Sequence, residues 1–573
     1  MRCGVAVIRS RPMRATAALC LLATFAVAGE AFAVPGPDTV AVVANANVPG
    51  SVMLATRYAE GRAIPMRQRC VLDLPTGDTI TLAEYRARLS APLRRCLEAS
   101  GVDARIEAVV LTRGVPLRVT VPVAGGAHTA SLAAVLMVDR ARYLDGGAFV
   151  DVAAPGVARS CGGSPCLAAR WANPYTAGVF APGWTADLSG VRWDLRLVTM
   201  LHGRSDDEAA RLMQSALDGD AAGGVPGTWL LMNGADPARG ALDGQYDAVA
   251  AALRDLGQTD VARVPFDTAL TGRTLAAFVT GTAALGATIE GNRFSPGAIV
   301  DNLTSLGAVP QNFTTMGEAQ VSISRWAAQG VAGVHGAVDE PLNNCFPHRR
   351  FLTEYAEGAT LAEAYLRNMP FVFWRNLVLG DPMAAPWAKR PRVTARGATE
   401  AEVIDRPRSI EFHAAPPAGG TVATTVLYVD GVERARAEGD TVRICLEGDG
   451  ARELLAVSQL AEDTGVGLHQ PKGWTRLRVT LRGATGPCVS DADASARDAS
   501  ASDVGTSDAG ASDAGVSDVS ASDAGVRDGG DGGCGCRARG GSAQGGAAAW
   551  MLAMLVVRWR RRGARCDSGR RAG

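Results

Sequence analysis

Polar side chains follow several apolar runs of this chain, at points where β-strands are expected to end. Asn45 and Asn47 close the run that begins at residue 38, and Arg113 closes the run that begins at residue 106. Glu340 and Asp381 follow two later runs. Carboxyl ends of parallel strands meet at one edge of a sheet, so we expect these five side chains to converge there. The planar fork of Arg113 is the predicted anchor for a carboxylate of a polar ligand, with Glu340 in the same pocket.

The same residues also have a structural interpretation, which stays open. Asn47 and Asp381 each stand shortly before a proline, where short polar side chains shape turns, and Arg113 could pair with Glu340 inside the fold. The triplet His348-Arg349-Arg350 is interpreted as the solvated start of a helix.

Two His-Gly pairs and one cysteine suggest a second chemistry. His202 follows the run "RLVTML", His335 follows "GVAGV", and Cys345 lies downstream of both. A thiolate nucleophile activated by an imidazole base would make the chain a hydrolase. However, only ten residues separate His335 from Cys345, which puts them in one loop. The alternative is that both histidines cap strands and that Cys345 is a small buried hydrophobe.

The elements that must position these residues form two successive patterns. Over residues 34–390 apolar runs alternate with stretches of helical spacing, as in "DTVAVVANAN" followed by "SVMLATRYAEGRA". This pattern predicts an α/β domain: an open, mostly parallel sheet flanked by helices and joined by right-handed crossovers. Over residues 391–488, short runs of period two predict a small all-β, immunoglobulin-like sandwich with a structural or adhesive role.

Both ends of the chain have the features of an exported protein. Residues 1–33 read as a signal peptide, with a basic start, an apolar stretch and an Ala31-Phe32-Ala33 cleavage site. Residues 489–532 carry an aspartate at every fifth position from Asp493 to Asp528 and bury almost nothing, which predicts a disordered stalk. A calcium-binding repeat is the alternative for this segment, although the paired carboxylates of calcium loops are missing.

Residues 533–573 combine a Cys534-Gly535-Cys536 triplet, an apolar run and an arginine cluster. The run Ala547–Val557 is shorter than the roughly 20 residues of a comfortable membrane span, so a weak anchor helix is one interpretation. The tripartite order resembles the MYXO-CTERM tail of myxobacterial surface proteins. That resemblance implies cleavage near Cys534 or Cys536 by a membrane-embedded sorting protease, followed by display on the cell surface.

The core carries a second resemblance. Residues 38–388 resemble an uncharacterised exported bacterial family found in genomes with exosortase-type sorting systems, on stretches that include "VVLTRGVPLRV", "FSPGAIVDNLTSLGA", "GVAGVHGAVDEP" and "PFVFWRNLVLGDPMAAPW". The family has no established activity, so the resemblance implies no reaction. Its sheet is loosely similar to that of gingipain and caspase peptidases, which take a His-Gly and a Cys from different strand ends. The stretch "VTGTAALGATIEGN" occupies the usual His-Gly place and contains no histidine.

Export permits disulfides among the 12 cysteines. Cys161 and Cys166 in "CGGSPC" are a predicted disulfide, with a zinc site as the alternative, but no second cysteine pair stands at a suitable spacing. Cys70 with Cys96 and Cys445 with Cys488 are further candidate pairs whose partners the sequence does not fix.

Composition excludes one class of partner. The chain has 58 basic and 58 acidic residues and no basic stripe in its folded part, so nucleic acid is not expected. We expect no cofactor and no metal. Two hypotheses for function result: a surface-displayed binding or structural protein on a degenerate peptidase-like scaffold, or a cysteine-peptidase-like hydrolase. The expected maturation partners are signal peptidase and the sorting protease.

Overall fold

The computed structural model describes residues 34–123, 126–140, 157–158, 170–173, 185–188, 191–314, 317–461 and 471–488. The signal peptide, the Cys161–Cys166 pair, the stalk and the tail with Cys534 and Cys536 fall outside these residues, so the predictions about them stay predictions.

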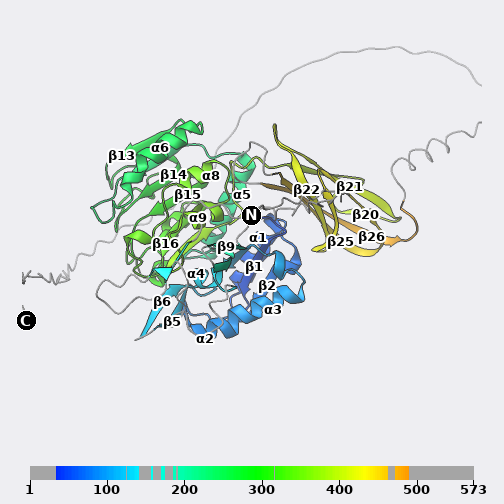
Figure 1. The fold of residues 1–573 in the computed structure, drawn as a ribbon, viewed down its shortest axis with the longest axis horizontal. Helices are drawn as coiled ribbons and strands as arrows, with labels where there is room; N and C mark the ends of the chain where they lie inside the picture. Colours follow the sequence, from blue (N-terminus) through cyan, green and yellow to red (C-terminus); the bar gives the residue numbers. More distant parts are fainter. Residues whose placement is uncertain are drawn as a thin grey trace, which may run out of the picture. The chain divides into compact units, whose positions relative to one another are not determined.

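A ten-stranded sheet forms the centre of the first part of the fold (Figure 1). Its spatial order is β13-β12-β14-β15-β16-β18-β11-β4-β1-β2. The strands are β1 Val40–Asn45, β2 Arg69–Leu72, β4 Ala108–Thr112, β11 Leu197–Leu201, β12 Thr228–Met232, β13 Val261–Val264, β14 Thr274–Thr280, β15 Arg293–Asn302, β16 Gly333–Ala337 and β18 Asn376–Gly380.

The sheet consists of two parallel blocks with one strand between them. The blocks are β13-β12-β14-β15-β16 and β11-β4-β1-β2. Strand β18 pairs antiparallel with β16 and parallel with β11, the latter at Met200 and Leu379. The sheet is therefore mixed with parallel strands predominating, as expected when crossover helices connect neighbouring strands.

Helices supply these crossovers and cover the sheet. They are α1 Pro49–Gly61, α3 Ala91–Ala99, α4 Leu132–Met137, α5 Asp206–Ala222, α6 Tyr246–Asp255, α7 Ile323–Ala328, α8 Phe351–Ala356 and α9 Leu361–Asn368. Helix α5 shows how the sequence sets these bounds. The Ser205 side chain accepts from the Glu208 amide at its start, and Gly223 ends it at φ 69°. The helical segment before α3 is irregular, with a π-helical stretch at Tyr85–Ser90 just before Pro92, whose nitrogen cannot donate.

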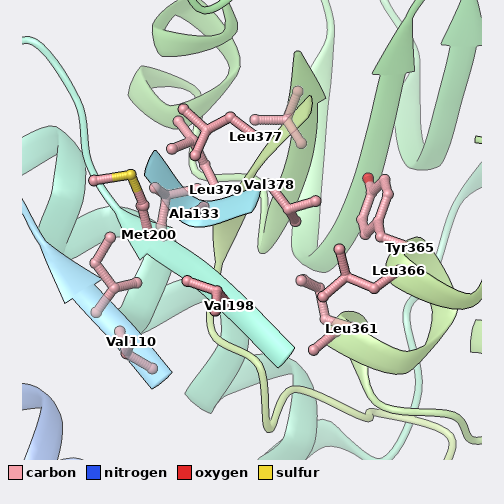
Figure 2. Close-up of a cluster of buried hydrophobic side chains, with 14 of the residues drawn as sticks. Val110, Ala133, Val198, Met200, Leu361, Tyr365, Leu366, Leu377, Val378 and Leu379 are labelled. Atoms are coloured by element: carbon pink, nitrogen blue, oxygen red, sulfur yellow. The ribbon is translucent and has the colours of Figure 1, made fainter. Parts of the chain in front are cut away.

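One continuous apolar core lies between the sheet and its helices. Every residue of β1, β4, β11 and β18 is buried, which explains why these runs lack the alternation of a half-exposed strand. Figure 2 shows how side chains of three neighbouring strands meet helix α9 in this core. The labelled examples include Val110 of β4, Met200 of β11, Val378 of β18 and Leu361 and Leu366 of α9.

The second part of the fold is all β. A five-stranded sheet of order β20-β26-β25-β22-β23 faces a three-stranded sheet of order β19-β21-β24. The strands are β19 Arg392–Arg396, β20 Glu402–Ile404, β21 Arg408–Ala415, β22 Val422–Val429, β23 Val432–Glu438, β24 Thr441–Leu446, β25 Gly448–Leu460 and β26 Lys472–Ala484. Phe412, Leu427 and Leu454 are fully buried in a separate apolar core shared by the two sheets. This is a two-sheet arrangement of the kind predicted; the limits 34–390 and 391–488 remain proposals.

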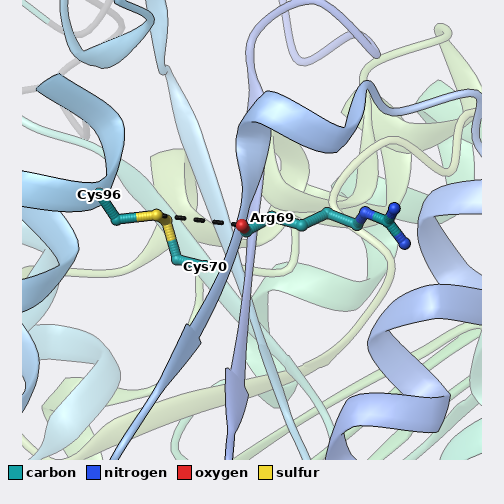
Figure 3. The surroundings of a disulfide bond; sticks show 3 residues. All are labelled: Arg69, Cys70 and Cys96. Carbon is teal, nitrogen blue, oxygen red and sulfur yellow. Dashed lines mark hydrogen bonds between the residues drawn. A yellow bond between two sulfur atoms is a disulfide. The ribbon is translucent and has the colours of Figure 1, made fainter. Parts of the chain in front are cut away.

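Two disulfides brace the described residues. Cys70 in β2 is bonded to Cys96 in α3, and Cys445 in β24 is bonded to Cys488. Figure 3 shows the first of these, with the Cys96 sulfur 3.9 Å from the carbonyl oxygen of Arg69. The Cys70–Cys96 bond fastens the edge strand of the large sheet to the helix that covers it. Cys345 keeps its thiol and is buried.

Among the residues that the structure describes, no helix is long and apolar enough to cross a membrane.

Candidate functional site

Asn45, Asn47 and Arg113 follow strand ends as predicted, but their side chains bond other parts of the protein. The buried side chain of Asn45 donates to the carbonyl oxygens of Pro75 (3.1 Å) and Gly114 (2.7 Å). Asn47 donates to Asp73 (2.7 Å) and to the Leu74 carbonyl. These bonds tie the loops after β1, β2 and β4 together, which is a structural task.

Arg113 does not reach Glu340. Its guanidinium donates to Asp206 (2.7 Å) and to the carbonyl oxygens of Gly203 (3.2 Å) and Arg204 (3.1 Å), just before helix α5. Glu340 instead accepts from the Leu342 amide at 3.2 Å, and its carbonyl oxygen accepts from Arg375. The pairing of Arg113 with Glu340 considered from the sequence is therefore not found, because Asp206 satisfies Arg113.

Asp381 lies at the opposite edge of the sheet from Asn45. Helix α1 leaves the carboxyl end of β1 and must return to its amino end, because β2 runs parallel to β1. Asp381 accepts from Tyr58 (2.6 Å) and pairs with Arg62, both at the end of α1. The expected place of Asp381 beside Asn45 is therefore not found, because its partners come from the end of α1.

The Asp381 cluster is a buried ionic hub. Arg62 also pairs with Asp220 at 2.6 Å, and both Arg62 and Asp381 are excluded from water. Burial opposes the charge on Arg62, but Asp381 and Asp220 raise its pKa above the ordinary value. Asp381 additionally accepts from the Met383 amide, which shapes the turn after Pro382 as the structural interpretation proposed. The hub holds α1, α5 and the segment after β18 together.

A second buried cluster lies at the ends of β15 and β16. Asp301 accepts from His335 Nδ1 at 2.7 Å through one oxygen and pairs with Arg349 through the other. Arg349 also donates to the Thr280 carbonyl at 3.3 Å, and its own amide donates to the Gln245 side chain at 2.8 Å. Asp301, His335 and Arg349 are each no more than 1% exposed. The interpretation of Arg349 as part of a solvated helix start is therefore wrong.

Charge balance explains why this cluster is stable without water. Burial would raise the pKa of Asp301, but Arg349 and His335 hold it below its ordinary value. Asp301 and Arg349 carry opposite charges, and their direct pairing suits a site closed to water. The Nε2 atom of His335 lies 3.1 Å from Oδ1 of Asn376.

The neighbouring ends of β14 and β15 carry further polar residues beside this cluster. Strand β14 ends at Thr280, paired with Asn302 at the end of β15. Asn302 holds Thr282 at two points, accepting from its amide at 2.9 Å and donating to its carbonyl at 3.0 Å. The Ala235 amide donates to the Gly281 carbonyl at 2.8 Å, so the loop after β12 closes over this strand end. The neighbouring ends of β14 and β15 thus present threonine, aspartate and asparagine.

The two His-Gly histidines have contacts of their own within the fold. Both ring nitrogens of His335 are engaged by Asp301 and Asn376, and His202 packs edge-on against Phe313 with ring centroids 4.5 Å apart. Burial and the nearby Arg113 lower the pKa of His202 to about 3, so its ring is neutral. Cys345 packs with Phe371 and Trp374. Packing explains the glycine after His335, because a side chain at Gly336 would meet Ile323 at 2.6 Å.

An open groove adjoins the buried cluster. It has a volume of about 580 Å³ and lies between helix α6 and the residues that begin α8. Ala248, Val249 and Ala252 form an apolar side, and the opposite side carries His348 and Asn368. Burial and the two following arginines lower the pKa of His348, which favours a neutral ring at neutral pH.

Gln245 links this groove to the buried cluster. Its side-chain oxygen accepts from the Arg349 amide, while its nitrogen lies 3.5 Å from His348 Nδ1. Two features of the sequence could have pointed to this cluster. Asp301 stands near the end of an apolar run, and Arg349 follows later in the chain as an arginine that could balance the charge of Asp301. Among the described residues there is no cluster of histidine, cysteine or carboxylate side chains that could hold a metal ion.

Comparison with known proteins gives no family. No family model matches the chain, and no curated protein matches it. Among solved structures, fibronectin(III)-like modules of Clostridium thermocellum CbhA show 16% identity and a TM-score of 0.14, covering 16% of this chain and 99% of that one. An endo-β-1,4-mannanase from Thermotoga petrophila shows 8% identity and a TM-score of 0.13, covering 44% of this chain and 47% of that one. At such scores neither likeness bears on function.

Proposed function

We propose that this chain is an exported cell-envelope protein that binds a ligand on a peptidase-like scaffold without a working Cys/His dyad. The observation that carries the proposal is the engagement of both His335 ring nitrogens inside the closed cluster of Asp301 and Arg349. A general base must be able to reach a reacting group, and this imidazole is held away from solvent.

The groove beside α6 is the proposed ligand site. Its volume of about 580 Å³ is within the range of small-ligand pockets, and it combines an apolar side with a few polar groups. Gln245 fixes its inner end by bonding the Arg349 backbone, so the groove is built on a rigid support. Export rests on the signal peptide and tail expected from the sequence. Signal peptidase and a membrane-embedded sorting protease are the proposed maturation partners.

One observation keeps a hydrolase as the second candidate. The buried ring of His128, on strand β6 Gly126–Ser131, lies 5.8 Å from the ring of Trp374, and Cys345 packs against the same tryptophan. Neither ring nitrogen of His128 has a hydrogen-bond partner among the described residues. Burial first, then Arg375, lowers its pKa to about 4, so its ring is a neutral base. A thiol activated by His128 would be a different dyad from the one expected from the sequence.

Thiol labelling separates the two candidates. In the native protein, Cys345 should react slowly with iodoacetamide near pH 6, because it is buried. The His128→Gln variant should label at the same slow rate, and denatured protein should label fully. Selective labelling of native Cys345 that disappears in His128→Gln would favour the hydrolase instead. Intact-mass measurement of surface-released protein tests export, since the proposal expects no residues beyond about Cys536.

A further inference from the structure

A second cavity lies away from the strand ends discussed above. It has a volume of about 530 Å³ and crosses the amino-terminal ends of β14 and β15. Two arginines, Arg273 and Arg293, contribute to its wall, together with Thr274, Glu290 and Gln329. Nothing in the proposed function uses this cavity.

The backbones that carry the two arginines are fixed to each other. The Arg293 amide donates to the Arg273 carbonyl at 2.8 Å, and the Arg273 amide donates to Asn292 Oδ1 at 2.9 Å. Asn292 is buried, and its NH2 group donates to the carbonyl oxygens of Leu270 (2.8 Å) and Thr288 (2.7 Å). The two arginine side chains therefore start from backbone positions that are bonded to each other.

The two arginines carry charge that the described part of the chain does not compensate. Neither side chain makes an ion pair or hydrogen bond there, in contrast to Arg62, Arg113 and Arg349. The carboxylate in the wall, Glu290, is already engaged at two points by Arg325, at 2.6 and 2.8 Å. The cavity thus offers two unpaired positive charges on adjoining strands, and its one negative charge is neutralised.

We propose that Arg273 and Arg293 form a binding site for a phosphate group. A guanidinium fork matches two oxygens of a phosphate, and two arginines that line one cavity suit a doubly charged tetrahedral anion better than a single carboxylate. The phosphate is either the free inorganic ion or a monoester borne by a larger envelope molecule. Because Arg273 is half-buried and Arg293 is exposed, binding weakens as salt concentration rises.

Calorimetric titration of the full mature protein tests this site. Inorganic phosphate and glycerol 3-phosphate are the two probes, titrated at constant ionic strength, with sodium chloride as the reference salt. The variants are Arg273→Ala, Arg293→Ala and their combination. The matched control is Arg263→Ala, since Arg263 pairs with Asp247 and lies outside the cavity.

Each single substitution should weaken phosphate binding about tenfold, the scale of one charge-assisted contact, and the double variant should abolish it. Arg263→Ala should bind as the unaltered protein does. Tighter binding of glycerol 3-phosphate would identify the monoester as the ligand, and equal binding would identify the free ion. The proposal is overturned if neither probe gives heat beyond the chloride reference, or if the double variant binds both probes with unchanged affinity. Unchanged thermal midpoints in all variants exclude misfolding as the cause of any loss.

Discussion

Arg349 and the pair Arg273 and Arg293 show two opposite uses of the same side chain. Arg349 is buried at the carboxyl ends of the central strands, where Asp301 and the Thr280 carbonyl occupy its fork. Arg273 and Arg293 stand at the amino-terminal ends of β14 and β15, in a cavity, with no partner among the described residues. The buried arginine stabilises the fold, whereas the two unpaired arginines are free to meet an anion.

This contrast also explains why the predicted binding edge is structural. Asn45 and Arg113 are polar where their strands are apolar, which made them candidates for ligand contacts. In the fold their hydrogen-bonding groups are used internally, by Pro75, Gly114 and Asp206. A polar residue at a strand end therefore indicates a binding site only when its partners do not come from the protein itself.

The largest expected effect comes from breaking the buried cluster. Asp301→Ala leaves Arg349 as an uncompensated buried charge, which costs about 3–5 kcal/mol of unfolding free energy. Urea unfolding measures this loss. The control Asp247→Ala removes an exposed partner of Arg263 and should cost less than about 1 kcal/mol. Equal, small losses in both variants would show that Asp301 does not hold the strand ends together.

The next largest effect is expected from the Cys70–Cys96 disulfide, which braces the large sheet internally. Replacing both Cys70 and Cys96 by serine removes a bond that closes a loop of sequence separation 26, which should cost about 3 kcal/mol. Thermal unfolding with and without reductant checks this value. Reductant should lower the midpoint of the unaltered protein by more than that of the double variant, which retains only the other described disulfide. Equal midpoint shifts would contradict a stabilising role for Cys70–Cys96.

The buried, neutral ring of His202 should make stability depend on pH. Its folded pKa is about 3, whereas the unfolded chain takes up the proton near pH 6.5. The contribution is therefore complete above about pH 6.5 and is lost as pH falls toward 3, about 2 kcal/mol of it by pH 5. His202→Gln should flatten the unfolding free energy over this window. The stability that Asp301 contributes is lost at lower pH. Because its pKa in the folded protein is depressed, this loss begins only below about pH 4. An unchanged pH profile in His202→Gln would contradict a neutral buried ring.

The smallest expected effect belongs to Arg113. Its side chain is 30% exposed and its partner Asp206 is 45% exposed, so Arg113→Ala should cost no more than about 1 kcal/mol. Phosphate titration of this variant should match that of the unaltered protein, in contrast to Arg273→Ala. A loss of ligand binding in Arg113→Ala alone would restore the strand-end edge as a functional site.

The local sequence pattern predicted much of the architecture, but it did not predict which polar side chains contact one another. The alternation of apolar runs with helical spacing predicted the strands β1, β4 and β11 and the helices that cover them, and the change after Pro391 predicted further β structure. Sequence did not disclose that Asp206 would reach Arg113, or that Asp381 would meet Arg62 across 319 residues of chain. Such pairings depend on the direction and neighbours of each strand, which the order of residues alone does not specify.

The most direct measurement of the central claim is peptide hydrolysis by the mature protein and its Cys345→Ala variant. A diverse peptide mixture would be incubated with each at neutral pH, and products would be read by mass spectrometry. We expect the two proteins to give the same, background level of products, because His335 is locked to Asp301 and Asn376. Cleavage by the unaltered protein that disappears in a folded Cys345→Ala variant would contradict the account and establish a cysteine peptidase.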